Sequence, residues 1–207
     1  MKISYAITVC NELEEIKRLL DLLIENKREQ DEIVVLLDNS KSSKQLETLL
    51  EGYSHKYAIT FTSDCFNNHF ADWKNKLTSY CTGDYIFQID ADEYPHPYFI
   101  ENLPAILEHN SSVELYAVSR VNTVEGLTQE HIQKWKWQVD DNGWVNWPDF
   151  QTRIYKNSPD IKWVNKVHER LQGHKEFCYL PMSEEYALFH PKTISKREKQ
   201  NNYYDSL

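Results

Sequence analysis

The stretch DYIFQIDADE, residues 84–93, joins an apolar run directly to an acidic cluster. Its first part predicts a buried strand over residues 85–89, so the acidic residues lie where that strand leaves its sheet. Asp90 and Asp92 are one residue apart and point the same way while the backbone stays extended. Such a pair suits Mg²⁺ or Mn²⁺ beside a diphosphate, whereas a solvated turn is the simpler explanation of an isolated Asp-x-Asp.

Strands and helices alternate over the first 110 residues. The predicted strands are Ile3–Val9 and residues 32–37, 57–62 and 85–89. Helices are predicted between them, and the first is expected to begin at an Asn11 cap with Glu14 completing a capping box. Apolar strands that alternate with helices indicate an α/β fold, a mostly parallel sheet with helices on both faces.

Polar residues follow three of these strands, at residues 8–12, 38–40 and 90–93. Ligands of parallel α/β sheets bind at the carboxyl ends of the strands, so we expect these residues to meet at one rim. Asp38 either accepts hydrogen bonds from the base or ribose of a nucleotide or builds a turn with Asn39 and Ser40. Spacing alone leaves both interpretations open.

The pattern changes after residue 110. Short strands are predicted over residues 113–121, 151–155, 163–171 and 186–189, and the charged tail from Ser195 is predicted to be helical. Aromatic faces stack on sugar rings, so one or two of the five tryptophans over residues 135–163 suit an acceptor cleft and the others suit packing. We expect a single domain over residues 1–207, in which residues 1–110 bind a nucleotide and residues 111–207 select the substrate.

Composition excludes several classes of protein. A net charge of -9 argues against a nucleic-acid polymer as partner, since such binders need a basic face. The four cysteines form no C-x-x-C pair, which favours free thiols in a reducing, cytoplasmic setting over a zinc site or disulfides. No apolar run is long enough for a transmembrane segment, and no signal-peptide pattern is present.

The chain resembles glycosyltransferases of the GT-A fold, in particular family 2 and its subgroup that includes lipopolysaccharide core glycosyltransferases. The resemblance extends over residues 3–204. It is carried by the order and spacing of ITVCNELEEI (7–16), VVLLDNS (34–40), FADWKN (70–75), GDYIFQIDADE (83–93), WPDFQTRIYKN (147–157), WVNKVHERL (163–171) and LFHPKT (188–193).

The resemblance implies a set of site residues. Those expected to contact the nucleotide-sugar are Thr8, Val9, Asn11, Glu12, Asp38, Lys74, Asn75, Asp90 and Ala91. Lys74 departs from the Arg-Asn pair that such enzymes often have at this place. Asp90, Asp92 and His190 are expected to hold Mn²⁺ or Mg²⁺. Lys192, Lys196, Arg197 and Lys199 could reach the diphosphate, although a solvated helix face explains them equally well.

The catalytic base is not fixed by a motif, because the Glu-Asp pair that many family 2 enzymes use is absent between Glu93 and His168. Glu169 and Asp149 are the two candidates. Glu169 is preferred, and Asp149 is then expected to orient the acceptor. A salt bridge to Arg153 or Arg170 is the structural alternative for both carboxylates.

The function implied is metal-dependent transfer of a sugar from a nucleoside-diphosphate donor, by default a UDP-sugar, to a hydroxyl of a saccharide or other acceptor. The resemblance further implies inversion at the anomeric carbon. A nucleotidyltransferase is the enzymatic alternative, but it would show a Gly-rich phosphate loop, and the chain holds only 5 glycines. A non-catalytic module that binds a sugar or nucleotide is the other alternative.

Overall fold

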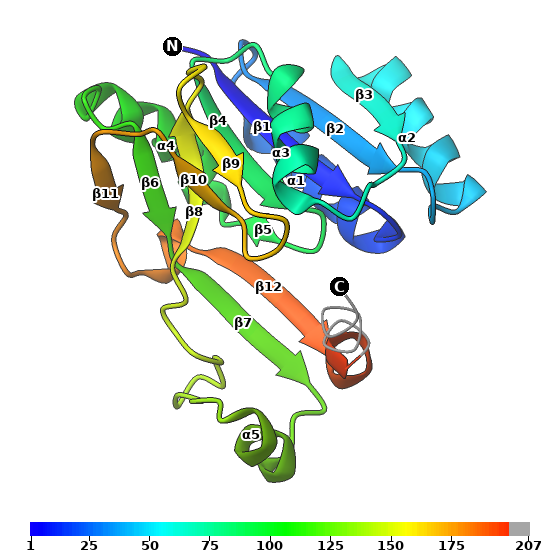
Figure 1. Cartoon of the computed structure of the whole chain (residues 1–207), viewed down its shortest axis with the longest axis vertical. Coiled ribbons are helices and arrows are strands. Elements are labelled where there is room, and N and C mark those ends of the chain that lie inside the picture. The colour runs from blue at the N-terminus through cyan, green and yellow to red at the C-terminus, as the bar shows by residue number, and fades with distance from the viewer. Residues whose placement is uncertain (199–207) are drawn as a thin grey trace.

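The computed structural model describes residues 1–198 (Figure 1). In chain order its elements are β1 (Ile3–Val9), α1 (Leu13–Asn26), β2 (Glu32–Asp38), α2 (Lys44–Lys56), β3 (Ile59–Asp64), α3 (Phe70–Ser79), β4 (Tyr85–Asp90), β5 (Tyr94–Pro95), α4 (Pro97–His109), β6 (Leu115–Val118), β7 (Arg120–Glu125), α5 (Gln129–Trp135), β8 (Gln151–Lys156), β9 (Lys162–Val164), β10 (Arg170–Gln172), β11 (Phe177–Tyr179), the 3-10 turn η1 (Glu184–Tyr186) and β12 (Leu188–Thr193).

A seven-stranded sheet in the order β11-β6-β8-β4-β1-β2-β3 forms the centre of the molecule. Strands β3, β2, β1 and β4 are parallel, whereas β8 runs antiparallel to both of its neighbours, β4 and β6. The predicted mostly parallel α/β sheet is therefore confirmed. Strands β6, β8 and β11 come from the second half of the chain and extend the sheet that the first half begins.

Helices cover both faces of this sheet. Ile16, Leu19, Leu20 and Leu23 are fully buried, as their helical spacing predicts, and they join α2 and α4 in one apolar cluster. The opposite face packs against α3 and β9, where Leu77 and Trp163 are buried. Burial of each such side chain contributes about 1.5–3 kcal/mol, so the central strands are held rigidly from both sides.

A three-stranded sheet projects from the main sheet as an arm. Its order is β5-β12-β7, and β12 runs parallel to β7 over six residue pairs. Figure 1 shows this arm reaching away from β4 and β8, with α5 near its far end. The arm matters for the site because it brings residues 120–125 and 188–193 beside the loop that follows β4.

Several sequence-based boundaries are wrong. The N-cap of α1 is Glu12 rather than Asn11, and no side chain caps this helix. Residues 113–121 form two strands that separate at Ser119, residues 163–171 form the antiparallel pair β9 and β10, and residues 186–189 join a 3-10 turn to β12. Periodicity could not show these breaks, because each lies inside a short apolar run. The helix predicted from Ser195 is present over residues 194–198, and its remainder, with Lys199, lies outside the described residues.

None of the helices within residues 1–198 is long and apolar enough to span a membrane.

Glu32 begins β2, at the end of the sheet opposite to the acidic rim. It accepts hydrogen bonds from Lys2, Ser4 and Thr82, which outweigh the effect of burial and lower the pKa of its carboxyl to about 2. A carboxyl with a lowered folded-state pKa contributes stability above its unfolded pKa and loses it as pH falls through the folded value. We therefore predict that Glu32→Gln flattens the decline of unfolding free energy between about pH 4.5 and pH 2. Urea unfolding at several pH values measures this, and an unchanged decline would contradict it.

Candidate active site

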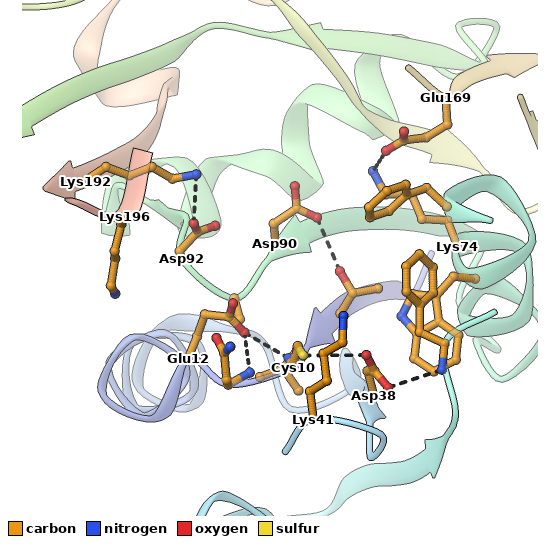
Figure 2. Close-up of a pocket in the computed structure, with 17 residues that line it drawn as sticks. Cys10, Glu12, Asp38, Lys41, Lys74, Asp90, Asp92, Glu169, Lys192 and Lys196 are labelled. Carbon is orange, nitrogen blue, oxygen red and sulfur yellow. Dashed lines mark hydrogen bonds and ion pairs between the residues drawn. The ribbon is translucent and has the colours of Figure 1, made fainter. Parts of the chain in front are cut away.

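A cavity of about 480 Å³ lies at the carboxyl ends of β1, β2 and β4 (Figure 2). Thr8 on β1 is paired with Asp90 on β4, and Val9 with Leu37, the residue before Asp38, so strand register alone brings the three polar ends together. Of the residues named from the sequence, the cavity is lined by Thr8, Val9, Asn11, Glu12, Asp38, Lys74, Asp90, Ala91, Asp92, Glu169, Lys192 and Lys196.

Asn75, Asp149 and His190 were expected at the site but do not line this cavity. The Asn75 amide instead holds β9 against α3, through Nδ2 to the Trp163 carbonyl at 2.8 Å and Oδ1 to the Trp163 N–H at 3.0 Å. This packing role replaces the nucleotide contact expected of Asn75. Asp149 and His190 face a second, smaller hollow described below.

The loop after β1 is held by its own acidic side chain. Glu12 Oε2 accepts hydrogen bonds from the backbone N–H groups of Cys10 and Asn11, at 2.9 and 3.0 Å. The Cys10 thiol donates to Asp38 at 3.5 Å, and burial together with the nearby carboxylates raises its pKa to about 12. The raised pKa favours the neutral thiol form of Cys10 at physiological pH.

Of the two roles that the sequence left open for Asp38, the structure shows the turn role. Its Oδ1 accepts from the Ser40 N–H at 3.0 Å, the Ser40 hydroxyl at 2.6 Å and the Phe66 N–H at 3.2 Å, which is turn chemistry. Burial opposes ionisation, but these bonds outweigh it and lower the pKa of Asp38. The carboxylate is thus charged while it borders the cavity, where it could accept from a nucleotide.

Lys74 and Glu169 form a close ion pair at one end of the cavity. Lys74 Nζ lies 2.6 Å from Glu169 Oε1 and 4.5 Å from the centre of the Trp163 ring. Lys74 is only 5% exposed, so its charge depends on Glu169 for compensation. The sequence had offered Arg153 or Arg170 as partners of Glu169; the structure shows that Lys74 is the partner.

Asp90 lies between this pair and Asp92 (Figure 2). Its Oδ1 is 3.3 Å from the Thr8 hydroxyl, and its Oδ2 accepts from Arg153 Nη2 at 2.7 Å. Burial opposes ionisation of Asp90, but the charges of Arg153 and Lys74 hold its pKa well below the ordinary range. Arg153 is nearly buried on β8 and was not predicted as a site residue.

Asp92 contacts the arm rather than the main sheet. Its Oδ2 is 3.4 Å from His190 Nε2 and 3.3 Å from Lys192 Nζ, both on β12. His190 Nδ1 lies 2.7 Å from Asn122 Oδ1, a partner that can only accept, so Nδ1 carries the proton. Despite burial, the contacts of Asp92 with His190 and Lys192 lower its pKa.

The residues present fit a divalent cation in part. Within residues 1–198, no three His, Cys, Asp or Glu side chains lie close enough together to form a ready-made metal site, and Asp90 is engaged by Arg153. Asp92 and His190 remain: Nδ1 of His190 is engaged by Asn122, and Nε2 faces the Asp92 carboxylate, so these two side chains are the ones that would hold a cation here. Mg²⁺ and similar ions are commonly held by one or two protein ligands together with substrate phosphates.

The second hollow, of about 180 Å³, is lined in part by His190 and Lys192. Asp149 borders it, and its Oδ2 accepts from Arg120 Nε at 2.9 Å, Arg120 Nη2 at 2.7 Å and Asn122 Nδ2 at 2.7 Å. Burial raises the pKa of Asp149, but the Arg120 charge and these hydrogen bonds outweigh it and lower the pKa below its ordinary value. Arg120, not Arg153 or Arg170, is the partner of Asp149.

The tryptophans divide between packing and the second hollow. Trp163 is buried in the core, and Trp144 packs against Trp147 with ring centres 4.8 Å apart. Trp137 lines the second hollow, beside Trp135 at 4.6 Å. Trp137 is therefore the tryptophan placed to contact a ligand there.

A mostly parallel sheet with Asp-x-Asp at the carboxyl end of β4, beside a large cavity, defines the GT-A class of fold. A family model described as glycosyl transferase family 2 matches residues 4–173. The chain therefore belongs to glycosyl transferase family 2. No curated protein sequence matches it.

Solved structures agree on the fold. The chain is similar to S. aureus TarS, with a TM-score of 0.62 and 15% identity, over 97% of this chain and 38% of TarS. It is similar also to TarS 1-349 in complex with UDP, with a TM-score of 0.60 and 15% identity, over 92% of this chain and 60% of that one. The chain thus spans less than two thirds of either TarS structure.

Proposed function

We propose that this chain transfers a sugar from a nucleoside-diphosphate donor in the large cavity to a hydroxyl acceptor in the second hollow. The observation that carries this proposal is the position of Asp92, His190 and Lys192 between the two spaces: Asp92 borders only the cavity, His190 only the hollow, and Lys192 both. A donor whose diphosphate lies at this boundary would present its anomeric carbon to the hollow. UDP is the proposed nucleotide, since TarS, which shares the fold, has been solved with UDP.

The donor would be held by three groups of residues. The loop over residues 8–12 and Asp38 would contact the nucleoside, and Lys192 would approach the diphosphate. Asp92 and His190 would hold Mn²⁺ or Mg²⁺, which when bound neutralises charge on the departing diphosphate. Asp90 is held in place by Arg153. Its Oδ1, which now lies near the Thr8 hydroxyl, would accept a hydrogen bond from a hydroxyl of the sugar that is transferred.

We assign the catalytic base to Asp149. A base must reach the acceptor hydroxyl on the face opposite the leaving group. Asp149 borders the second hollow, whereas Glu169 lines the donor cavity and is paired to Lys74. This geometry favours Asp149 over the preference drawn from the sequence. We propose a single displacement with inversion. Glu169 would then act on the donor sugar through Lys74.

A ligand screen tests the proposal. Thermal unfolding is measured with UDP, GDP, ADP and CDP, each with and without Mn²⁺. We predict that one nucleoside diphosphate raises the melting temperature only with the metal, because ligands that bind the native state alone stabilise it. The corresponding nucleotide-sugars are then tested for hydrolysis to the free sugar. Binding without hydrolysis of any donor would favour a non-catalytic module, and no binding would overturn the proposal.

A further inference from the structure

Glu93 follows the Asp-x-Asp pair and is completely buried, yet the proposed reaction does not use it. A buried carboxylate is costly unless its oxygens are fully paired. Glu93 Oε2 accepts from the Asp90 backbone N–H at 3.2 Å. Its Oε1 accepts from two guanidinium groups, Arg153 Nη2 at 2.7 Å and Arg120 Nη1 at 3.0 Å. Glu93 is thus the shared partner of two arginines on different strands.

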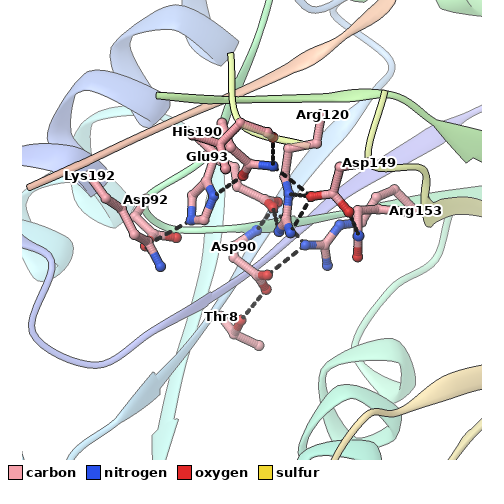
Figure 3. A network of polar contacts seen from close by, with 12 residues as sticks. Thr8, Asp90, Asp92, Glu93, Arg120, Asp149, Arg153, His190 and Lys192 are labelled. Atoms are coloured by element: carbon pink, nitrogen blue, oxygen red, sulfur yellow. Dashed lines mark hydrogen bonds and ion pairs between the residues drawn. The ribbon is translucent and has the colours of Figure 1, made fainter. Parts of the chain in front are cut away.

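The two arginines lead to opposite sides of the site (Figure 3). Arg153 on β8 also binds Asp90, the carboxylate that borders the donor cavity. Arg120 on β7 also binds Asp149, the carboxylate that borders the second hollow. Contacts therefore run without interruption from Asp90 through Arg153, Glu93 and Arg120 to Asp149.

The charges along this line alternate. Three carboxylates and two guanidinium groups give a net charge of 2 − 3 = −1. Neutralising either Asp90 or Asp149 leaves the remaining charges balanced. Neutralising both leaves two arginines that share only Glu93, with a net charge of +1 in a buried setting. Once both outer carboxylates are neutral, the positions of Arg153 and Arg120 therefore depend on Glu93, the carboxylate that they share.

We propose that Glu93 is a positioning residue that couples the donor-side carboxylate Asp90 to the acceptor-side carboxylate Asp149 through Arg153 and Arg120. The roles of the two sides rest on the proposed function, whereas the coupling itself does not. One oxygen of Glu93 accepts hydrogen bonds from both arginines. The position of Asp90 relative to Asp149 is therefore fixed through the Glu93 carboxylate. A displacement of Glu93 would disturb both sides at once.

A double-mutant cycle tests the coupling without any ligand. The unfolding constant is measured in urea for Asp90→Asn, Asp149→Asn and the double variant. If the two substitutions acted independently, the unfolding constant of the double variant would change by the product of the two single-variant factors. We expect it to exceed that product about fivefold or more, because side chains in one network have non-additive effects. The same cycle is then repeated in the Glu93→Gln background, where the excess should shrink to within about twofold of additivity.

The controls isolate the role of Glu93. A cycle of Asp90→Asn with Glu32→Gln, at the opposite end of the sheet, should be additive. If Glu93→Gln does not fold, Arg120→Gln is used instead, because Arg120 is the more exposed of the two arginines. This substitution interrupts the same series of contacts and should also remove the non-additive effect on the unfolding constant. Additive effects of Asp90→Asn and Asp149→Asn in the unmodified chain, or an excess that survives in the Glu93→Gln background, would overturn the inference.

Donor hydrolysis supplies a second measurement. Glu93→Gln should lower kcat for hydrolysis of the donor that the screen identifies about ten- to hundredfold, because small displacements of site residues are costly. Glu32→Gln should leave kcat unchanged although it also removes a paired carboxylate. Equal kcat values for these two variants would overturn the positioning role. A chain that hydrolyses no donor would refute the proposed function and leave the unfolding cycle to decide the coupling.

Discussion

Replacement of Asp92 by Asn should lower the rate of sugar transfer or donor hydrolysis roughly 10²- to 10³-fold while the chain remains folded. Asp92 lies close to His190 Nε2 and Lys192 Nζ. It is therefore the carboxylate that faces the basic side chains between the cavity and the second hollow. Removing its charge takes away the anionic half of the proposed cation site. Binding of Mn²⁺ in the presence of UDP, followed by electron paramagnetic resonance, should weaken in parallel.

The matched control is Asp21→Asn on α1, where the carboxylate likewise has two side-chain partners, Lys17 and Tyr53, but lines neither the cavity nor the second hollow. It should leave the rate and Mn²⁺ binding unchanged. If Asp92→Asn keeps full activity and Mn²⁺ affinity, the assignment of Asp92 to the metal and diphosphate is wrong. If it instead unfolds the chain, Asp92 has a structural role.

Replacement of Asp149 by Asn should lower kcat roughly 10²- to 10⁴-fold with little effect on donor affinity, as expected for loss of a general base. Replacement of Glu169 by Gln should have the opposite signature, a higher KM for the donor and a smaller loss in kcat, because Glu169 and Lys74 line the donor cavity. Steady-state kinetics with varied donor separates the two. The reverse pattern would return the base to Glu169.

The pH profile gives an independent check on Asp149. A base acts when ionised, and the lowered pKa of Asp149 places the acid limb of the kcat profile below the ordinary range of an aspartate. Arg120→Gln removes the main charge that lowers this pKa, so the limb should move to higher pH. An acid limb that does not move would show that Asp149 is not the titrating group.

Much of the site was predictable because it depends on short-range pattern. The apolar strands β1, β2 and β4 were found from their composition, and parallel strands bring their carboxyl ends to one edge. Eight of the predicted residues, all at or just after the ends of these strands, consequently line the cavity. The subgroup that includes lipopolysaccharide core enzymes was also inferred from motifs, and it remains a prediction.

The partners of the carboxylates were not predictable in this way. The sequence suggested Arg153 or Arg170 for Asp149 and Glu169, since those arginines are near in the chain. The fold instead pairs Asp149 with Arg120 and Glu169 with Lys74, across 29 and 95 residues. Glu93 was not among the predicted site residues, and its two arginines are 27 and 60 residues away in sequence.

The sequence by itself determined the strands, the acidic rim that follows β4 and membership of a glycosyltransferase family, because each depends on residues within about ten positions or on a series of motifs. Only the tertiary structure decided which charges meet. Strand β8 enters the sheet between β4 and β6, and β12 pairs with β7 to form the arm. This order brings Arg153 to Asp90 and His190 to Asp92. Buried charges must be paired, and their partners are fixed by strand order rather than by distance along the chain.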